Sequence, residues 1–299
     1  MAPKHRQCGT MIAHNWLLEC DPNLRRKLHD LQHDTAKRMA MAKPGPLTLL
    51  KIPVVVHVVY NKAVENISVA QIKSQIAVLN KDYRAANADK SKVPTPWKGL
   101  VTDAKVQFAL ATKDPKGKKT DGITRTHTTK TAFGISGDPV KKTASGGAAP
   151  WNPSKYLNIW ICNLGGGLLG YAQFPGMPAK TDGVVILYSA FGTTGAAKAP
   201  FNRGRTATHE IGHWLNLRHI WGDTEDCSGS DLVPDTPNAA GPNYGKPAFP
   251  HVSCGNGPNG DMFMNYMDYV DDAAMFMFTT QQVARMRATL AGPRQSVVS

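Results

Sequence analysis

The sequence predicts a mixed α/β fold, in which a twisted mixed sheet is packed by helices. A run rich in valine, residues 52–60, is typical of a strand that is buried on both faces. Ser68 then caps a predicted helix that carries apolar residues at positions 72, 76 and 79. Further strand candidates follow at residues 105–111, 122–128, 156–163 and 183–190. Because one strand, one helix and then several strands follow each other, a mixed sheet with helices against it is expected.

The first 46 residues differ from this pattern. Asp21 and Pro22 mark the start of a helix with leucines at helical spacing, and residues 43–46 end the segment as a linker would. We expect a short amphipathic hairpin or helix that is too small to fold alone. The chain therefore divides into an N-terminal extension, residues 1–46, and one larger domain, residues 47–299.

Regular structure is also expected to be scarce in residues 221–262, which are dominated by glycine, proline, asparagine and aspartate. So long a stretch without a helix is unusual in a compact domain. A disulfide, a bound metal or both must hold it. The next regular element is a predicted helix that Thr279 caps, with apolar residues at positions 283, 286 and 290.

Composition narrows the class of protein. Hydrophobic residues make up 41% and charged residues 19% of the 299 positions, as in an ordinary soluble globular protein without a membrane span. The formal charge of +13 is unaccompanied by any nucleic-acid-binding motif, so we favour a solvated basic surface over nucleic-acid binding. The N-terminal residues lead into no apolar signal core. The chain either stays inside the cell or is given without its signal peptide, and we favour a secreted protein.

One short stretch carries a metal-site pattern. His209 and His213 are four residues apart, so both imidazoles lie on one helix face and can reach one ion. Glu210 is offset around the helix and can take a proton from a metal-bound water as general base. His219 follows after a reversal of the chain, for which Asn216 must adopt a positive φ. Three histidines with one open position are typical of a catalytic zinc.

These residues resemble the metzincin motif H-E-x-x-H-x-x-G-x-x-H, with Asn216 where glycine is usual. Residues 265–269, Asn-Tyr-Met-Asp-Tyr, resemble the methionine turn of the same peptidases. Together with residues 231–237 and 169–175, the chain is similar to the pappalysin family of metzincins over essentially everything after residue 47. The resemblance implies a twisted five-stranded mixed sheet with a backing helix and an active-site helix in an upper subdomain. It also implies an irregular lower subdomain with the methionine turn and a C-terminal helix.

The resemblance further implies a zinc-dependent endopeptidase that acts on protein or peptide substrates. Met267 would lie in the turn under the metal; the alternative is one more core methionine, but the surrounding residues favour the turn. Tyr269 would stabilise the oxyanion of the tetrahedral intermediate, or simply pack beneath the site. An edge strand with Gly170, Tyr171 and Ala172 would pair with an extended substrate.

Two further features are implied for the irregular region. Cys227 and Cys254 would form a disulfide. Asp231, the carbonyl of Val233 and Thr236 would bind a structural calcium ion, whereas the alternative is a set of surface turn residues. Asp271 and Asp272 lie beyond the methionine turn, near the expected S1′ pocket, where they could favour basic side chains after the cut; solvated acids explain them as well.

The N-terminal extension contains Arg6, Cys8 and Gly9, which resemble the cysteine switch of pappalysin-like proenzymes. In that switch the Cys8 thiolate binds zinc in its fourth position and displaces the catalytic water. A Cys8–Cys20 disulfide is the alternative, but the chain has five cysteines, and an odd number leaves a thiol to account for. We favour the switch, with residues 1–46 as an inhibitory prosegment.

Two other functions stay open from the sequence. A non-proteolytic zinc-binding module of the same fold is one, although Glu210, which a degenerate site usually loses, is present. An intracellular hydrolase of small peptides is the other, and it predicts that Cys227 and Cys254 are reduced.

Overall fold

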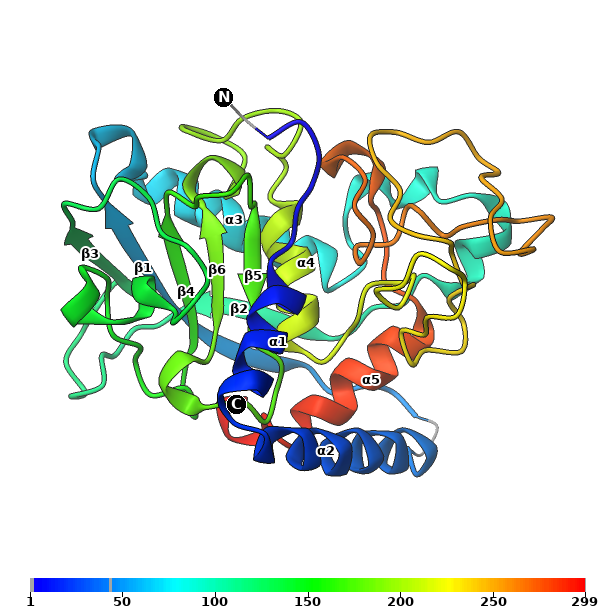
Figure 1. Ribbon diagram of the computed structural model, residues 1–299, viewed down its shortest axis with the longest axis horizontal. Helices are drawn as coiled ribbons and strands as arrows, with labels where there is room; N and C mark the ends of the chain where they lie inside the picture. Colours follow the sequence, from blue (N-terminus) through cyan, green and yellow to red (C-terminus); the bar gives the residue numbers. More distant parts are fainter. Residues whose placement is uncertain (1–2, 43–44, 299) are drawn as a thin grey trace.

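A mostly parallel sheet and the helices around it form one half of the molecule, and an irregular region forms the other (Figure 1). The computed structural model describes residues 3–42 and 45–298. Lys43 and Pro44 of the predicted linker lie outside the described residues. Five helices and six strands are present among the described residues, joined by short 3-10 turns: α1 (Thr10–Cys20), α2 (Asn23–Ala40), β1 (Leu50–Tyr60), α3 (Val69–Asp82), β2 (Val106–Leu110), β3 (Ile123–His127), β4 (Leu157–Cys162), β5 (Gly170–Ala172), β6 (Val184–Leu187), α4 (Arg205–Trp214) and α5 (Thr280–Leu290).

The sheet has the strand order β2-β1-β4-β6-β5, with β3 also paired to β1. Only β5 runs antiparallel to its neighbour. Val54 of β1 pairs with both β2 and β4, and Val56 pairs with both β3 and β4. It follows that β2 and β3 lie one after the other along the same edge of the long strand β1. The sheet is therefore five strands wide, as expected, but it contains six strands rather than five.

Helices α3 and α4 correspond to the predicted backing and active-site helices. Ser68 Oγ accepts a hydrogen bond of 3.1 Å from the amide of Gln71 and so caps α3. Ile72 and Leu79 of α3 are fully buried. Helix α3 packs against β2 and α4, and α4 packs against β5 and β6 (Figure 1). The active-site helix is therefore held beside the antiparallel edge strand.

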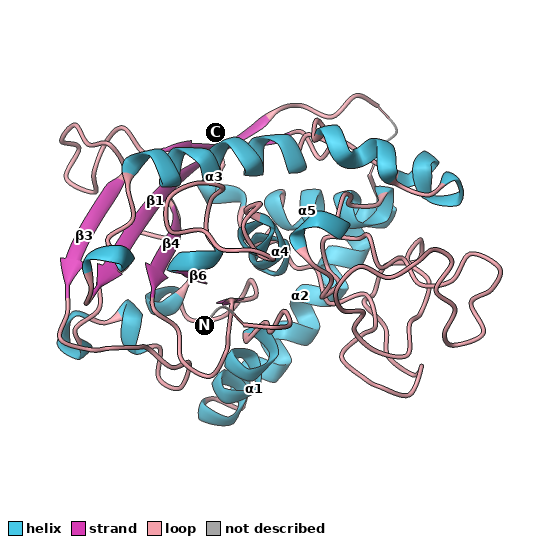
Figure 2. Cartoon of the chain, turned by 90° about the horizontal axis from the view of Figure 1, so that it is seen from above, coloured by secondary structure: helices cyan, strands magenta, loops and turns pink. Residues whose placement is uncertain are grey.

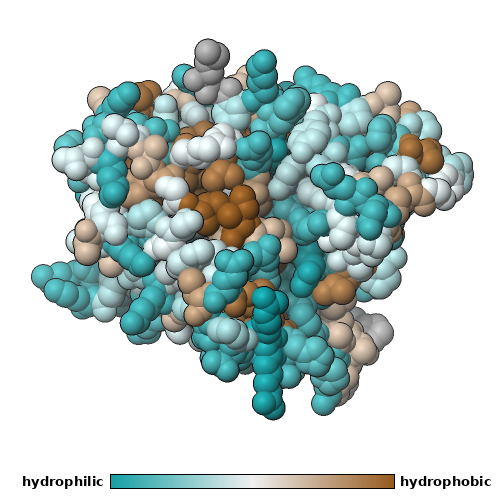
Figure 3. All heavy atoms as spheres, in the orientation of Figure 1, coloured by the Kyte–Doolittle hydropathy of each residue, from teal (hydrophilic) through white to brown (hydrophobic). Residues whose placement is uncertain are grey.

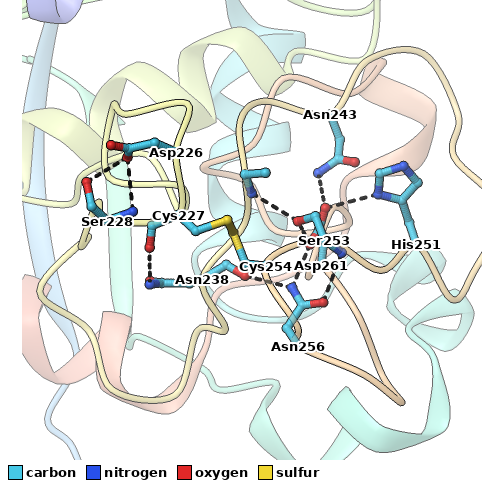
Figure 4. Close-up of a disulfide and its surroundings, with 11 residues drawn as sticks. Asp226, Cys227, Ser228, Asn238, Asn243, His251, Ser253, Cys254, Asn256 and Asp261 are labelled. Atoms are coloured by element: carbon cyan, nitrogen blue, oxygen red, sulfur yellow. Dashed lines mark hydrogen bonds and ion pairs between the residues drawn. A yellow bond between two sulfur atoms is a disulfide. The ribbon is translucent and has the colours of Figure 1, made fainter.

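The irregular half contains the one disulfide found in the described chain. Residues 221–262 form no helix or strand, as predicted. Cys227 and Cys254 are joined across a sequence separation of 27 residues. Hydrogen bonds surround the disulfide: Asn238 donates to the Cys227 carbonyl, and Asp261 accepts from Ser253 (Figure 4). These polar contacts and the cross-link replace secondary structure in this region.

The N-terminal extension folds into two helices, α1 and α2, so of the two predicted alternatives it forms the hairpin rather than the single helix. Helix α1 contacts β5 and α2, and α2 lies along α5 (Figures 1 and 2). Leu17, Leu18 and Leu24 form a small apolar cluster with Met177 of the larger domain. The extension thus crosses the edge of the sheet and continues beneath the C-terminal helix.

Much of the face seen in Figure 3 is hydrophilic, with an apolar patch near its centre. Ile12 of α1 contributes exposed apolar surface to the molecule, because 57% of it is accessible. Among the helices of the described residues, none is both long and apolar enough to span a bilayer.

Candidate active site

The three predicted histidines converge at the end of α4. The Nε2 atom of His213 lies 3.1 Å from those of His209 and His219, and the remaining Nε2–Nε2 distance is 3.3 Å. Each Nδ1 atom has an oxygen partner on the opposite side of its ring. Those partners are the carbonyls of Tyr266 and Leu217, at 2.7 and 2.8 Å, and a carboxylate oxygen of Asp223 at 2.5 Å. An Nδ1 proton bound in this way leaves each Nε2 lone pair free for a metal ion.

The chain between His213 and His219 makes the expected reversal. Helix α4 ends at Trp214, and Asn216 adopts a φ of +75°. The amide of Leu217 then donates to the carbonyl of Gly212 at 2.9 Å. A left-handed residue at this point turns the chain back so that the third imidazole reaches the first two.

Met267 lies directly beneath the active-site helix. It is fully buried, and its amide donates to Asn265 Oδ1 at 2.9 Å. A Cβ atom added to Gly212 would lie only 2.5 Å from the Met267 sulfur. The methionine turn therefore approaches α4 so closely that only glycine fits at position 212.

The fourth position of the cluster is filled from the N-terminal extension. The sulfur of Cys8 and one nitrogen of each histidine all lie within 4.8 Å of one another. Cys8 and Cys20 are both free thiols, so the alternative disulfide between them is not formed. Gly9 packs closely here, because an added Cβ would lie 2.4 Å from Ile135 Cδ1, which would have to move.

The electrostatic environment fits a metal ion. Burial, followed by repulsion among the three imidazoles, lowers the pKa of His209 and of His213 well below 6.5, so both are neutral at physiological pH. Burial, followed by the charge of Glu210, raises the pKa of the Cys8 thiol. A divalent cation would reverse the second effect, since a coordinated thiol is deprotonated. Three imidazoles and one cysteine sulfur are a donor set that zinc binds tetrahedrally.

Glu210 projects from the same helix towards Cys8. Its Oε2 accepts hydrogen bonds from Cys8 Sγ at 3.3 Å and from Thr10 Oγ1 at 2.9 Å. Burial raises the pKa of the Glu210 carboxyl to about 7, against the opposing effect of these hydrogen bonds. Thr10 was not expected in the site, and a threonine in a short extension offers no sequence signal for such a role.

The hydroxyl of Tyr269 lies beside the same segment. It accepts from the Cys8 amide at 3.3 Å and lies 3.4 Å from the Cys8 carbonyl. The centre of its ring is 4.9 Å from that of His219. Burial is the main cause that raises the pKa of Tyr269, so the phenol keeps its proton.

Strand β5, which contains the residues expected to pair with a substrate, lies beside Glu210 and the Cys8 segment. Its main chain is already paired, because the amide of Gly9 donates to the Gly170 carbonyl at 2.8 Å and Ala172 donates to Thr10 Oγ1. A Cβ atom on Gly170 would lie 2.9 Å from Cγ of Glu210. The side chain of Tyr171 is buried, so this strand offers the cleft main-chain groups.

Arg6 and Asp272 form an ion pair beyond the methionine turn. Arg6 is only 1% exposed, and its guanidinium donates to Asp272 Oδ1 at 2.6 Å and to Thr206 Oγ1 at 3.1 Å. Asp272 is fully buried, whereas Asp271 is partly exposed. Of the two acids considered from the sequence, only Asp272 therefore meets a basic side chain in the cleft.

The oxygen groups considered for calcium also lie together. Thr236 Oγ1 is 2.6 Å from Asp231 Oδ2 and 2.9 Å from the carbonyl of Val233. Burial raises the pKa of the Asp231 carboxyl to about 7. One carboxylate, one carbonyl and one hydroxyl are hard donors of the kind that calcium binds.

Comparisons with known proteins agree with this geometry. The family model described as "Pregnancy-associated plasma protein-A" matches residues 144–291. An extracellular metalloprotease of Pyricularia oryzae is 33% identical over 252 residues, which cover 81% of this chain and 75% of that protein. A promirolysin mutant of Tannerella forsythia has a TM-score of 0.90 at 47% identity, over 98% of this chain and 97% of that one. Mature mirolysin of the same organism, in complex with a cleaved peptide, has a TM-score of 0.82 at 53% identity, over 84% of this chain and 96% of that one.

An α/β fold of this kind, with its histidine cluster and these relatives, defines a zinc metalloendopeptidase. Within that class, the chain belongs to the pappalysin family, as the sequence motifs indicate.

Proposed function

We propose that the chain is a secreted endopeptidase in its latent form, with residues 1–46 as prosegment and residues 47–299 as catalytic domain. Promirolysin matches 98% of this chain and mature mirolysin only 84%, which supports an N-terminal segment that is removed on maturation. The single observation that carries the proposal is the arrangement of the Cys8 sulfur with three histidine nitrogens within 4.8 Å. Relatives described as extracellular metalloproteases, and the disulfide, support secretion.

The chemistry follows from the groups around the cluster. His209, His213 and His219 would hold a zinc ion, which would make water a stronger acid and nucleophile and would polarise the substrate carbonyl. Glu210 takes a proton from the attacking water and passes it to the leaving amine. A carboxyl with a pKa of about 7 is suited to both transfers near neutral pH. The Tyr269 hydroxyl donates a hydrogen bond to the oxyanion that develops on the carbonyl.

The chain is latent because residues of the prosegment bind the same groups that a substrate would bind. The Cys8 thiolate takes the position of the catalytic water. Thr10 donates to Glu210 Oε2, which is then unavailable as a base towards water. Gly9 takes up the carbonyl of Gly170, which a peptide would otherwise pair with. Substrate and prosegment are therefore mutually exclusive in this cleft.

The substrates we propose are extended peptides with a basic residue just after the cut. The supporting observation is Arg6, a buried guanidinium in the cleft that pairs with the buried carboxylate of Asp272. When the prosegment leaves, Asp272 loses its cation in a poorly solvated position. An arginine or lysine from the substrate would restore the ion pair.

We also propose a structural calcium ion bound by Asp231, the Val233 carbonyl and Thr236. The support is the proximity of the three oxygen groups, since Thr236 Oγ1 lies 2.6 Å from Asp231 Oδ2 and 2.9 Å from the Val233 carbonyl. Calcium here would brace the irregular half together with the disulfide.

Cleavage of a diverse peptide library tests the proposal. The parent chain, Cys8→Ala and Glu210→Ala are compared, and the cut sites are identified by mass spectrometry. We expect Cys8→Ala to cleave without processing, before arginine or lysine, and Glu210→Ala to be inactive. Undiminished cleavage by Glu210→Ala would refute the mechanism. A Cys8→Ala chain as silent as the parent would refute the role of the thiol in latency.

A further inference from the structure

Helix α2 of the N-terminal extension covers the turn that links two of the zinc-binding histidines. Asn216, at the centre of this turn, is only 1% exposed. Gln32 Nε2 donates a hydrogen bond to Asn216 Oδ1 at 3.0 Å. Asn216 Nδ2 lies 3.4 Å from Thr35 Oγ1. Thr35 is fully buried. Both ends of the Asn216 side chain therefore face polar groups of α2.

Arg285 of α5 closes this network from the other side. Its Nε donates to the Asn216 carbonyl at 2.7 Å, and its Nη2 donates to Gln32 Oε1. Burial lowers the pKa of Arg285 to about 10, so the side chain remains a cation at neutral pH in a poorly solvated place. The side-chain oxygen of Gln32 thus accepts a hydrogen bond from the buried cation Arg285, and its side-chain nitrogen donates one to Asn216 in the turn.

The covered turn supports the histidine cluster directly. The carbonyl of Leu217 accepts from His213 Nδ1 at 2.8 Å, while the Nε2 atom of the same ring faces the other histidines. Cys8 approaches the Nε2 side of the cluster. Helix α2 therefore touches the scaffold of the site on the Nδ1 side of His213, away from the contact made by Cys8.

The side chain of Asn216 makes this contact possible. A glycine would provide the positive φ of +75° at lower cost, but it would present no polar group to Gln32 and Thr35. The asparagine serves the turn and, in addition, offers a donor and an acceptor to α2. The position at which the sequence departs from the usual metzincin motif is the position that α2 contacts.

We infer that Asn216 and Arg285 form a docking surface for helix α2, and that Gln32 and Thr35 bind this surface as a second latch independent of Cys8. We call these four residues the rear latch. The inference rests on the proposed latency of the chain. The N-terminal residues can leave the cleft while α2 stays bound, and α2 then keeps them close enough to return. The rear latch therefore governs lasting release of the extension rather than its first opening.

Loss of the Gln32 amide removes one hydrogen bond from the buried cation Arg285 and one from the buried side-chain oxygen of Asn216. A hydrogen bond to a charged group contributes enough to stability that its loss shifts such an equilibrium by a factor of about ten or more. Gln32→Ala is therefore expected to increase opening of α2 by at least about tenfold. His33→Ala, an exposed neighbour on the same helix, is the matched control.

Hydrogen–deuterium exchange of the full-length, zinc-loaded chain tests the rear latch without requiring proteolysis. All variants carry Glu210→Gln, which keeps the chain uncut. We expect added Cys8→Ala to deprotect residues 6–12 and to leave α2 protected. Added Gln32→Ala should speed exchange in α2 and in residues 214–217 about tenfold, and His33→Ala should not. If α2 loses protection together with residues 6–12 in Cys8→Ala, or if Gln32→Ala changes nothing, the rear latch does not exist.

A second measurement connects the rear latch with activity. In the Glu210 background, Gln32→Ala should shorten the delay before peptide cleavage begins by about tenfold, and His33→Ala should leave it unchanged. An unchanged delay in Gln32→Ala would contradict a role of the rear latch in activation. Absence of cleavage both by Cys8→Ala and by a chain freed of residues 1–46 would instead refute the proposed function, while the exchange experiment would still decide on the rear latch.

Discussion

Replacement of Arg6 by alanine perturbs the link between the extension and the cleft at its most buried point. The Arg6 guanidinium donates to Asp272 at 2.6 Å, to Thr206 at 3.1 Å and to the carbonyl of Val270 at 3.3 Å. It also lies 5.1 Å from the centre of the Phe201 ring. Removing one partner of a buried ion pair costs about 3–5 kcal/mol, because the other charge remains buried without compensation.

The lower end of this range applies here. The amides of Arg203 and Arg205 still donate to the second oxygen of Asp272, so its charge is partly compensated. A loss of about 3 kcal/mol moves the balance between bound and displaced extension by about a hundredfold. Arg6→Ala should therefore begin to cleave peptides much earlier than the parent chain.

The assay follows a fluorogenic peptide with a central arginine, with full-length parent, Arg6→Ala and Arg26→Ala and no added protease. Arg26 is an exposed arginine of α2 and serves as the control. Circular dichroism verifies that each chain is folded. If folded Arg6→Ala remains silent for as long as the parent, the ion pair with Asp272 does not hold the extension in the cleft.

Three further predictions concern stability. The pKa of Asp231, raised to about 7 by burial, means that the folded chain binds a proton between about pH 4 and 7 that the unfolded chain has lost. Stability from this group therefore falls as the pH rises through that range, by at most about 4 kcal/mol, and calcium should raise the Tm more at pH 8 than at pH 5. Asp231→Asn should abolish that difference, and an equal calcium effect in both chains would argue against the site. Gly212→Ala should lower stability by about 1–3 kcal/mol in urea unfolding through its clash with Met267, whereas Gly134→Ala, with no atom within 4 Å of the added carbon, should not. Replacing both cysteines of the disulfide by serine should cost about 3.5 kcal/mol for a separation of 27 residues, and a loss below about 1 kcal/mol would show that the irregular half is held by other means.

The features of the fold that the sequence predicts correctly are those set by residues close together in the chain. The caps Ser68 and Thr279 lie where expected, because a capping side chain and the amide it binds are only three residues apart. The position of β3 beyond the end of β2 depends on pairing with β1, which no local pattern encodes. Helix α1 begins after Gly9, which offers no capping side chain, so its start carries no signal.

The candidate site shows the same division. The histidine spacing is a local property of one helix and one turn, so His209, His213 and His219 could be chosen from the sequence. Arg6 and Asp272 are 266 residues apart, and nothing near either residue indicates the other. Asp271 and Asp272 are adjacent and chemically identical, so the sequence offered no ground for choosing between the two acids.

The contacts of α2 were equally hidden. Gln32 has ordinary polar neighbours in the sequence, and its partners come from the turn after α4 and from α5. Such a side chain would be assigned to a solvated helix face on pattern alone. Only the packed structure shows that it faces a buried cation.

X-ray absorption at the zinc edge of the full-length chain tests the central claim most directly. The account predicts one zinc per chain, with three nitrogen ligands at about 2.0–2.1 Å and one sulfur ligand at about 2.3 Å. In Cys8→Ala the sulfur should be replaced by a light atom, with the three nitrogens retained. A full-length chain without zinc, or with zinc that lacks a sulfur neighbour, would contradict the account of a histidine site closed by Cys8.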